Sequence, residues 1–538
     1  MTDFRNSPFE AQLHTNFVPS DAECEQIRAD LVPRLLQLEL LNERIRELSA
    51  ERDKLQADID SHTALISYPR RLPVDIVREI FVACLPTNRN AVMSTQEAPL
   101  LISRICSAWR EIALTTPSLW ASIHVPIDFI LSHPVERILA LRHWLQLSGA
   151  LPISLALTPG THPFAPQFAD VLHDSAARWG NVEFRTLTFE VLSALATVQT
   201  PLLESITVIG HGEFLRHHAR QLLLFSAPSL RRLHLHSLGT ENLEDFFLDL
   251  PFCWNNLAHL SLISSGNPGH PSESGLSPGT VLKLLRQCPL LVSLIFFPAN
   301  RNDRADTSLS TSISLPFLES FILLDPCMWD LQTIGQLLQK LVTPELRQLH
   351  IQTEISSDNH HPLLSAIENI PLLETLFIHR SSFTEPAILQ ALRTLPDLTK
   401  LTVSNNKTWY WGQALDQEAL QLWDPQRLIV LLTPRESGST LCPRLQELAI
   451  HCDSMPSTVA TESFIRKRAG LGSGFRRLEV RWQEPKDAEL FSDEAIQEFR
   501  SQGVEVDLIF PSQYSISEPN QPMRVTPWTG LPWGTHWH

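Results

Sequence analysis

Long apolar runs, an excess of positive charge and a secretion signal are all missing from this sequence. No stretch of about 18 uncharged apolar residues occurs, so no membrane-spanning helix is expected. The opening MTDFRNSPFE has neither the basic nor the apolar region of a signal peptide. A formal net charge of −16 argues against nucleic acid or an anionic membrane as the main partner, because both need a basic surface. We expect a chain that works in the cytoplasm or the nucleus.

Motifs of catalysis and of metal or cofactor binding are also absent. The eight cysteines are scattered and include no C-x-x-C pair, which suits a reducing compartment. The glycine-rich loops that hold phosphates do not occur, and neither do H-E-x-x-H and G-x-S-x-G. We therefore predict no enzyme activity, no cofactor and no metal. A catalytic site in the stretch 404–434 is the remaining enzyme hypothesis.

The first part of the chain predicts a flexible leader, residues 1–24, and then a long helix over 25–67. Apolar residues in this helix recur at alternating spacings of three and four, with charged residues between them, as in a helix with one apolar seam. The seam consists of Ile27, Leu31, Leu38, Leu41, Ile45, Leu48, Leu55, Ile59 and Ile66, interrupted by Arg34, Arg52 and His62. Pro33 is expected near the helix start, because proline breaks a helix interior. The helix either folds back on the next domain or self-associates through 25–67.

From about residue 120 a strand-like unit, L-x-x-L-x-L, recurs down the chain. Eleven copies run from FRTLTF (184–189) to FRRLEV (475–480), and their commonest spacing is 27 residues. Such a strand cannot bury its apolar face alone, but stacked copies can. The spacing lies in the leucine-rich repeat range. We predict an α/β solenoid, a leucine-rich repeat horseshoe with parallel strands over 121–510, followed by a tail at 511–538. The 47-residue gap before LQELAI (445–450) holds either a degenerate repeat or an insertion.

The polar positions between the repeat leucines point to the opposite, concave face of the predicted sheet. We predict that this face binds a target protein through Arg232, His234, His259, His350, Phe377 and Lys400. Three such positions in each of eleven copies give 33 sites, and six of them are histidine. The histidines either form a stripe that senses pH or binds acidic partners, or are polar residues that a crowded sheet tolerates.

A helical block at 68–120 separates the long helix from the repeats, and it resembles the F-box family. The resemblance covers about 50 residues: an opening Leu72-Pro73 with an amphipathic helix, a second helix carrying Trp109, and a closing Pro117-Ser118-Leu119-Trp120. The stretch at 85–100 is longer than a minimal F-box turn, and Val74-Asp75 replaces the commoner proline or serine with glutamate. With the long helix before it and the repeats after it, the chain is also similar to the large fungal F-box families.

The resemblance implies a partner, the SKP-type linker of a cullin-RING ubiquitin ligase. The implied contact residues are Leu72, Pro73, Ile76, Ile80, Phe81 and Trp109. For Trp109 and Trp120 the alternative is a place in the core of the block itself. The implied function is that of a substrate-recognition adapter, which binds the linker through the F-box and a target through the repeats. The alternative is a protein–protein interaction scaffold without ligase association.

Overall fold

The computed structural model divides the chain into two compact units, residues 1–80 and 81–538. Each unit is described by itself. The residues that the structure describes are 7–66, 68–158, 166–185, 189–210, 222–236, 250–263, 276–296, 312–324, 331–352, 361–379, 383, 385–404, 425–434, 440–452, 456–470, 474–482, 491–509 and 526–527. Most of the predicted tail at 511–538 therefore lies outside the described residues.

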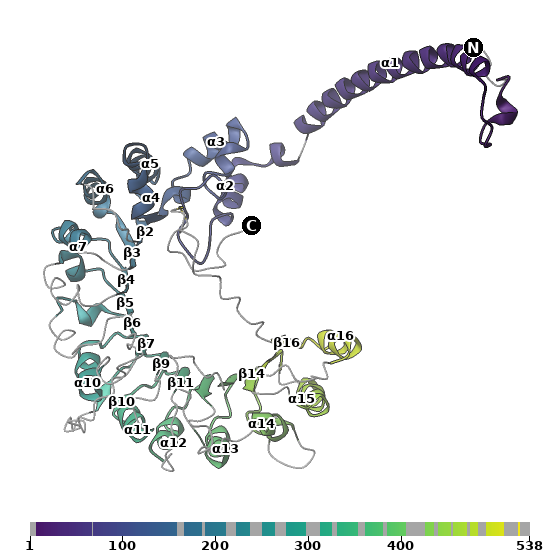
Figure 1. Cartoon of the computed structure of the whole chain (residues 1–538). Helices are drawn as coiled ribbons and strands as arrows, with labels where there is room; N and C mark the ends of the chain where they lie inside the picture. Colours follow the sequence, from purple (N-terminus) through teal and green to yellow (C-terminus); the bar gives the residue numbers. More distant parts are fainter. Residues whose placement is uncertain are drawn as a thin grey trace. The chain divides into compact units, whose positions relative to one another are not determined.

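The first unit contains a short 3-10 turn, η1 (Glu10–Gln12), and one 45-residue helix, α1 (Asp21–Leu65) (Figure 1). Ser20 caps the helix: its backbone N–H and its hydroxyl both donate to the Glu23 carboxylate, at 2.8 and 2.7 Å. These bonds lower the pKa of Glu23. This capping box fixes the helix start at Asp21 rather than at residue 25.

The expectation that Pro33 lies near the helix start was wrong, because Pro33 lies inside α1. The cap at Ser20 places the start well before the proline, so the chain is already helical when it reaches Pro33. A proline there removes the N–H that would donate to the carbonyl of Ala29, at a cost of about 3 kcal/mol. The helix tolerates this cost because only one turn loses a hydrogen bond and the other turns keep theirs.

The predicted helical block does consist of short helices. They are η2 (Tyr68–Arg71), α2 (Val74–Ala83), η3 (Ile102–Arg104), α3 (Ser107–Leu114) and η4 (Pro117–Trp120). Helix α2 crosses the boundary between the two units.

The second unit is built on one parallel sheet, to which the described residues contribute fourteen strands in chain order. These strands are β1 (Ser122–Pro126), β2 (Ile153–Thr158), β3 (Trp179–Arg185), β4 (Ser205–Ile209), β5 (Arg232–His236), β6 (His259–Ile263), β7 (Ser293–Phe296), β9 (Ser320–Leu324), β11 (Gln348–Gln352), β12 (Thr375–His379), β13 (Lys400–Ser404), β14 (Glu447–Cys452), β15 (Arg477–Trp482) and β16 (Glu505–Ile509). A separate parallel pair joins β8 (Ile313–Ser314) to β10 (Leu341–Val342).

Alternation of apolar and polar residues explains the sheet. In register, Leu233 of β5 pairs with Leu260 of β6, and Leu260 pairs with Leu294 of β7. All three side chains are buried, while the residues between them are mostly half-buried on the opposite face. One row of leucines thus builds a continuous core that no single strand could bury.

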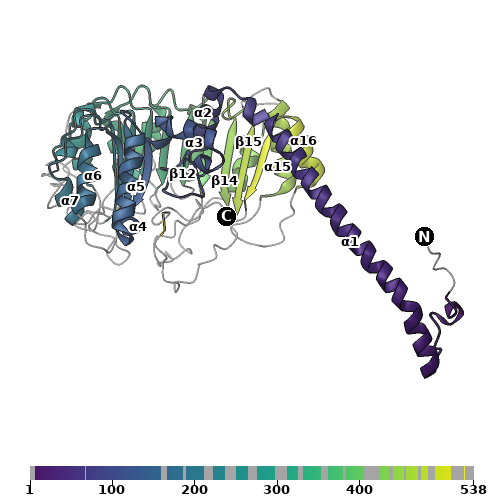
Figure 2. The ribbon, with the colours of Figure 1, turned by 90° about the horizontal axis from the view of Figure 1, so that it is seen from above.

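Helices cover the outer face of the sheet, and the strands line the inner, concave face of the arc (Figures 1 and 2). The α-helices are α4 (Ile127–Ser132), α5 (Pro134–Leu147), α6 (Pro166–Ala176), α7 (Phe189–Leu195), α10 (Pro278–Gln287), α11 (Leu331–Gln339), α12 (His361–Glu368), α13 (Glu385–Thr394), α14 (Pro425–Leu432), α15 (Thr458–Gly470) and α16 (Asp493–Ser501). Short 3-10 turns, η6 (Leu223–Ser226) and η7 (Trp254–Asn256), precede β5 and β6. The predicted α/β solenoid is confirmed.

Three details of the repeat prediction change. The first copy, FRTLTF (184–189), was wrong by register: strand β3 ends at Arg185, and its ladder residues are Val182 and Phe184. Two strands, β1 and β2, precede it without matching the leucine pattern. Because β13 pairs directly with β14, the 47-residue gap between their leucines is an insertion and not a further repeat.

The long stretch at 85–100 caps the first strand of the sheet. Asn90 Oδ1 accepts hydrogen bonds from the hydroxyls of Ser122 and Ser154, at 3.0 and 2.9 Å. Val92 forms a parallel bridge with His124 of β1. An exposed strand edge is a site of unwanted pairing, and this segment covers it. The residues by which the sequence departs from a minimal F-box turn therefore have a structural role in the second unit.

Candidate functional site

Helix α2 carries an exposed apolar face. Ile76 and Ile80 lie one turn apart on the helix and are 49 and 43 per cent exposed. Leu72, just before the helix, is 38 per cent exposed, and Pro73 is exposed as well. Four of the six residues predicted to contact a linker are thus open to solvent. Isolated apolar residues on a surface are ordinary, but a face of several large ones on one short helix is typical of a binding site.

The other two predicted contact residues belong to the second unit. Phe81 is fully buried, and its ring meets that of Trp109 edge to face with centroids 5.0 Å apart. Trp109 is half-buried. Phe81 is a core residue of the unit in this structure, so a direct contact with a partner would require that core to open.

Trp120 lies in the core of the helical block, which was the alternative to a contact with the linker. Its side chain is 2 per cent exposed, and its Nε1–H donates to the carbonyl of Ala113 at 2.9 Å. Its ring also meets Trp144 edge to face, with centroids 4.9 Å apart. Trp120 therefore joins the block to the first helices of the solenoid.

Sequence reasoning missed several exposed apolar residues between 81 and 120. They are Leu101, Ile105 and Leu114, each between 39 and 57 per cent exposed. The signal was present in the sequence, since they lie in or next to the two amphipathic segments at positions off the buried stripe.

The concave face brings the six predicted target-binding residues onto one surface. Register pairs the row His234, Ser261, Ile295, Ile322, His350 and Phe377 across strands β5 to β12. Arg232, His259 and Lys400 lie in the neighbouring row, at the first residue of their strands. The predicted residues form two groups, on β5–β6 and on β11–β13. Ile295 and Ile322, which the sequence reasoning did not select, lie between the groups.

Burial lowers the pKa of the histidines on this face. Desolvation lowers the pKa of His234, and neighbouring His236, His259 and Arg232 lower it further. Desolvation also lowers the pKa of His350 to about 4, and the His350 ring stacks on Phe377 with centroids 3.6 Å apart. These side chains are neutral at neutral pH. The structure therefore favours a neutral, partly aromatic surface over a cationic stripe for acidic partners.

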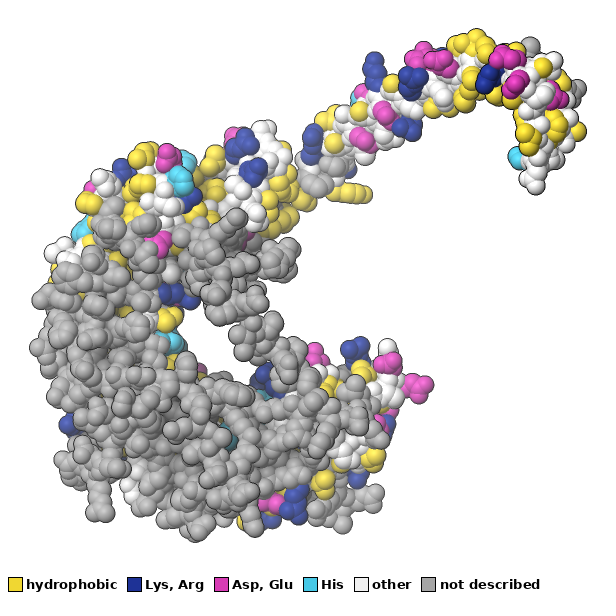
Figure 3. All heavy atoms as spheres, viewed as in Figure 1, with side chains coloured by type: hydrophobic (Ala, Val, Ile, Leu, Met, Phe, Trp, Pro, Cys, Tyr) yellow, Lys and Arg dark blue, Asp and Glu magenta, His cyan; other side chains and the backbone are white. Residues whose placement is uncertain are grey.

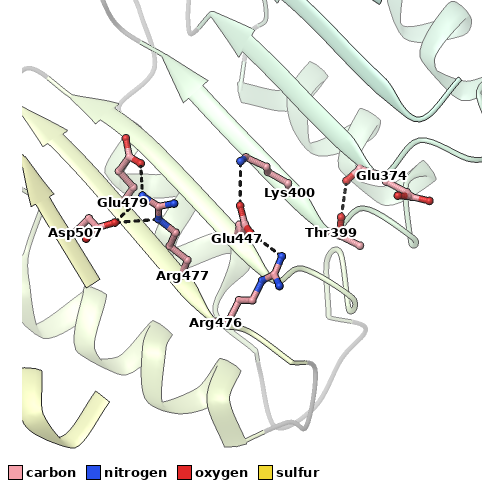
Figure 4. Close-up of polar contacts among 8 residues, drawn as sticks. All are labelled: Glu374, Thr399, Lys400, Glu447, Arg476, Arg477, Glu479 and Asp507. Atoms are coloured by element: carbon pink, nitrogen blue, oxygen red, sulfur yellow. Dashed lines mark hydrogen bonds and ion pairs between the residues drawn. The ribbon is translucent and has the colours of Figure 1, made fainter. Parts of the chain in front are cut away.

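The last strands carry charge instead, which the sequence reasoning missed (Figure 4). Glu447 of β14 bridges Lys400 of β13 at 3.0 Å and Arg476 at 2.8 Å, and the hydrogen bond from Lys400 is the largest cause of its lowered pKa. Arg477 of β15 pairs with Asp507 of β16 at 2.8 Å. Lys400, predicted to bind a target, is therefore already paired with a carboxylate.

Two hollows on the second unit contain none of the predicted site residues. The larger one, of about 590 Å³, has a mixed lining of apolar residues such as Leu290 and Phe317 and of charged residues, Arg231, Glu319 and Glu345. Within the described part of the chain, no group of three or more histidine, cysteine, aspartate or glutamate side chains is arranged to hold a metal ion. Over the same residues, no helix is both long and apolar enough to cross a membrane.

Comparisons with known proteins show limited likeness. No protein-family model matches the chain, and no curated protein matches it. Among solved structures, the leucine-rich repeat-containing protein LegL7 from Legionella pneumophila is 12% identical, with a TM-score of 0.33, over 65% of this chain and 97% of that chain. A chain of the yeast Rad7 and Elc1 complex is 16% identical, with a TM-score of 0.34, over 77% of this chain and 98% of that chain. At these TM-scores the likeness supports no conclusion about function.

Proposed function

We propose that this chain is the substrate-recognition adapter of an SKP–cullin–F-box ubiquitin ligase. Leu72, Pro73, Ile76 and Ile80 bind the SKP-type linker, and the concave face of the repeats captures a target protein. The chain performs no catalysis and supplies proximity between the target and the ligase.

The exposed apolar face of α2 is the observation that carries this proposal. Val77 and Phe81, one turn apart, are buried, while Ile76 and Ile80, one position earlier, are exposed. A helix that served only its own core would present polar residues at the exposed positions. Burying each isoleucine against a partner stabilises a complex by about 1.5–3 kcal/mol. Residues of this kind near the centre of an interface carry most of its binding energy.

The concave face supports the second half of the proposal. Its middle strands present Ile295, Ile322 and Phe377 together with neutral histidines, on a sheet that neighbouring repeats hold rigid. A rigid, partly aromatic surface binds another protein at a small entropic cost. Scaffolding without a ligase is the alternative function, and it would use the same face but not α2.

Co-purification with the SKP-type linker tests the proposal. The full chain should retain the linker, and the double variant Ile76→Asp/Ile80→Asp should weaken binding at least about a hundredfold, because two central apolar contacts are lost. Val82→Asp is the matched control: Val82 is 37 per cent exposed on the same helix but lies two residues beyond Ile80, on the other side. It should retain the linker. If the wild-type chain captures other proteins but never the linker, the adapter function is wrong and the scaffold function takes its place.

A further inference from the structure

Helix α1 leaves its whole apolar seam open. Seven seam residues are between 44 and 61 per cent exposed, and no residue of the helix is buried. These seven are Leu31, Leu38, Leu41, Ile45, Leu48, Leu55 and Ile59. In Figure 3, hydrophobic side chains run along this helix among acidic and basic ones. An exposed apolar stripe of this length, even with Arg34, Arg52 and His62 in it, marks an interaction surface.

We propose that α1 pairs with α1 of a second copy of this chain as an antiparallel coiled coil. The seam from Ile27 to Ile66 spans more heptads than the three or four that a coiled coil needs. Two identical seams meet in an isologous contact, the commonest arrangement of soluble dimers. This pairing does not depend on the proposed ligase function.

Charge disfavours the parallel arrangement. In a parallel pair in register, every seam residue faces its own counterpart. Arg34 would face the Arg34 of the second copy, and Arg52 would face the second Arg52. Two facing arginines within an apolar seam repel each other and lose hydration. Beside the two arginine layers no opposite charge offsets this cost: Arg44 and Glu51 would flank Ser49 and Gln56, which are uncharged, and the pair that a parallel dimer could form, Glu23 with Arg28, lies at the start of α1.

The antiparallel alignment removes both conflicts. When Ile45 faces Leu48 of the second copy, Arg52 faces Leu41 and Arg34 faces Ile59. The guanidinium of Arg34 already pairs with Asp30 at 3.0 Å, so its aliphatic stem can cover an isoleucine while its charge stays at the edge of the seam.

The same alignment creates an attraction. Arg44 and Glu51 flank the seam on the same side, and the antiparallel pairing brings each Arg44 beside the Glu51 of the other helix. The twofold symmetry makes two such ion pairs. Arg44 is exposed and its present partner, Glu47 at 3.0 Å, lies on the same helix surface, so the exchange needs only a change of rotamer. Exposed pairs of this kind contribute little affinity but fix the orientation of a coiled coil.

The mass of the full chain in solution tests the pairing, by light scattering after gel filtration at tens of micromolar. We expect twice the mass of one chain. Ile45→Asp/Leu48→Asp places aspartates opposite each other in the seam and should weaken the dimer more than a hundredfold. Leu36→Asp/Leu40→Asp is the matched control, because these residues are 59 and 63 per cent exposed but lie off the seam, and it should remain dimeric. A monomeric wild type, as expected if α1 folds back on its own chain, would overturn the proposal.

Disulfide formation tests the orientation. Arg34→Cys/Ile59→Cys should oxidise to a covalent dimer, because residues 34 and 59 face each other between the two helices. Ile59→Cys alone should stay at the wild-type background, since the two copies of residue 59 lie about 37 Å apart along an antiparallel pair. A covalent dimer from Ile59→Cys alone would show a parallel pair. Failure of both variants would refute the register.

Discussion

Strands β5 to β12 and strands β13 to β16 belong to one sheet, but the polar side chains on their concave face differ in charge. On the middle strands burial removes the charge: the pKa of His350 falls to about 4 and the pKa of His234 is lowered. On the last strands burial likewise lowers the pKa of His451 to about 4, but the arginine and lysine side chains keep an opposite charge beside them, as in the pair of Arg477 with Asp507. A partner that binds the middle strands would pack against neutral and aromatic side chains. A partner that binds the last strands would contact ion pairs, so its binding would depend on salt.

The largest expected effect concerns what holds the charged end of the sheet in place. Arg468 of α15 is fully buried and donates to the carbonyls of Leu432, Leu441 and Cys442, at 2.7 to 3.0 Å. It thereby ties the end of α14 to the segment before β14. Arg468→Ala leaves these carbonyls without their donor, and we expect it to lower the free energy of unfolding by about 3–5 kcal/mol. Chemical denaturation followed by circular dichroism measures the loss.

Arg466→Ala is the matched control for this prediction. Arg466 lies on the same helix, but it is exposed and pairs with Glu498 at 3.1 Å. Exposed ion pairs contribute about 0–1 kcal/mol. Equal losses from the two arginine variants would show that the buried network does not hold the last repeats together.

Acid should act on the sheet through His350 of the middle strands and also through His451 of β14, because burial lowers the pKa of each to about 4. The pKa of His350 is about 4 in the folded chain, against 6.5 for a free histidine, so the unfolded state binds the proton first. Stability is therefore complete above about pH 6.5 and falls as the pH drops toward 4. Between pH 7 and pH 5 the loss from this one residue is on the order of 2 kcal/mol.

The variant His350→Phe isolates this contribution. It keeps an aromatic ring against Phe377 and has no proton to gain, so its stability should depend less on pH than that of the wild type by about 2 kcal/mol over the same interval. Urea titrations at pH 7 and pH 5 make the comparison. An unchanged slope would mean that His350 is not desolvated on the concave face.

The smallest expected effect is a charge exchange on the last strands. Lys400→Glu places a second carboxylate beside that of Glu447. The repulsion should destabilise the fold by about 1 kcal/mol at low salt. The double variant Lys400→Glu/Glu447→Lys should recover part of that loss, and 1 M salt should shrink the difference. Recovery is incomplete because Arg476 also pairs with Glu447. A loss that is the same at every salt concentration would contradict an electrostatic cause.

Local pattern was enough to predict most of the fold. The leucine pattern predicted β4 to β7, β9 and β11 to β15, because the alternation fixes the buried face and the 27-residue spacing fixes the stacking. It failed at β3, where FRTLTF fits the leucine pattern better than the residues that pair with β4. It also failed at β1, whose buried apolar residues include isoleucine and valine, and at β2, which buries Leu155 and Leu157 but has Pro152 where the pattern needs its first leucine.

The site was harder to predict, because its contacts join residues far apart in the sequence. The concave positions followed from alternation, but the pairing of Lys400 with Glu447 spans the long insertion and requires the register. Arg468 gave no local signal, since its carbonyl partners lie 26 to 36 residues away. The low pKa of His350 depends on the crowding of adjacent strands, which a single strand does not reveal.

Hydrogen exchange of the full chain with and without a purified SKP-type linker tests the central claim most directly. The claim is that the exposed face of α2 binds the linker while the sheet remains free for a target. We predict slower exchange of the amides at 74–83 on adding the linker, and unchanged exchange in strands β5 to β12. Protection of those strands by the linker, or no protection of α2 at saturating linker, would contradict it.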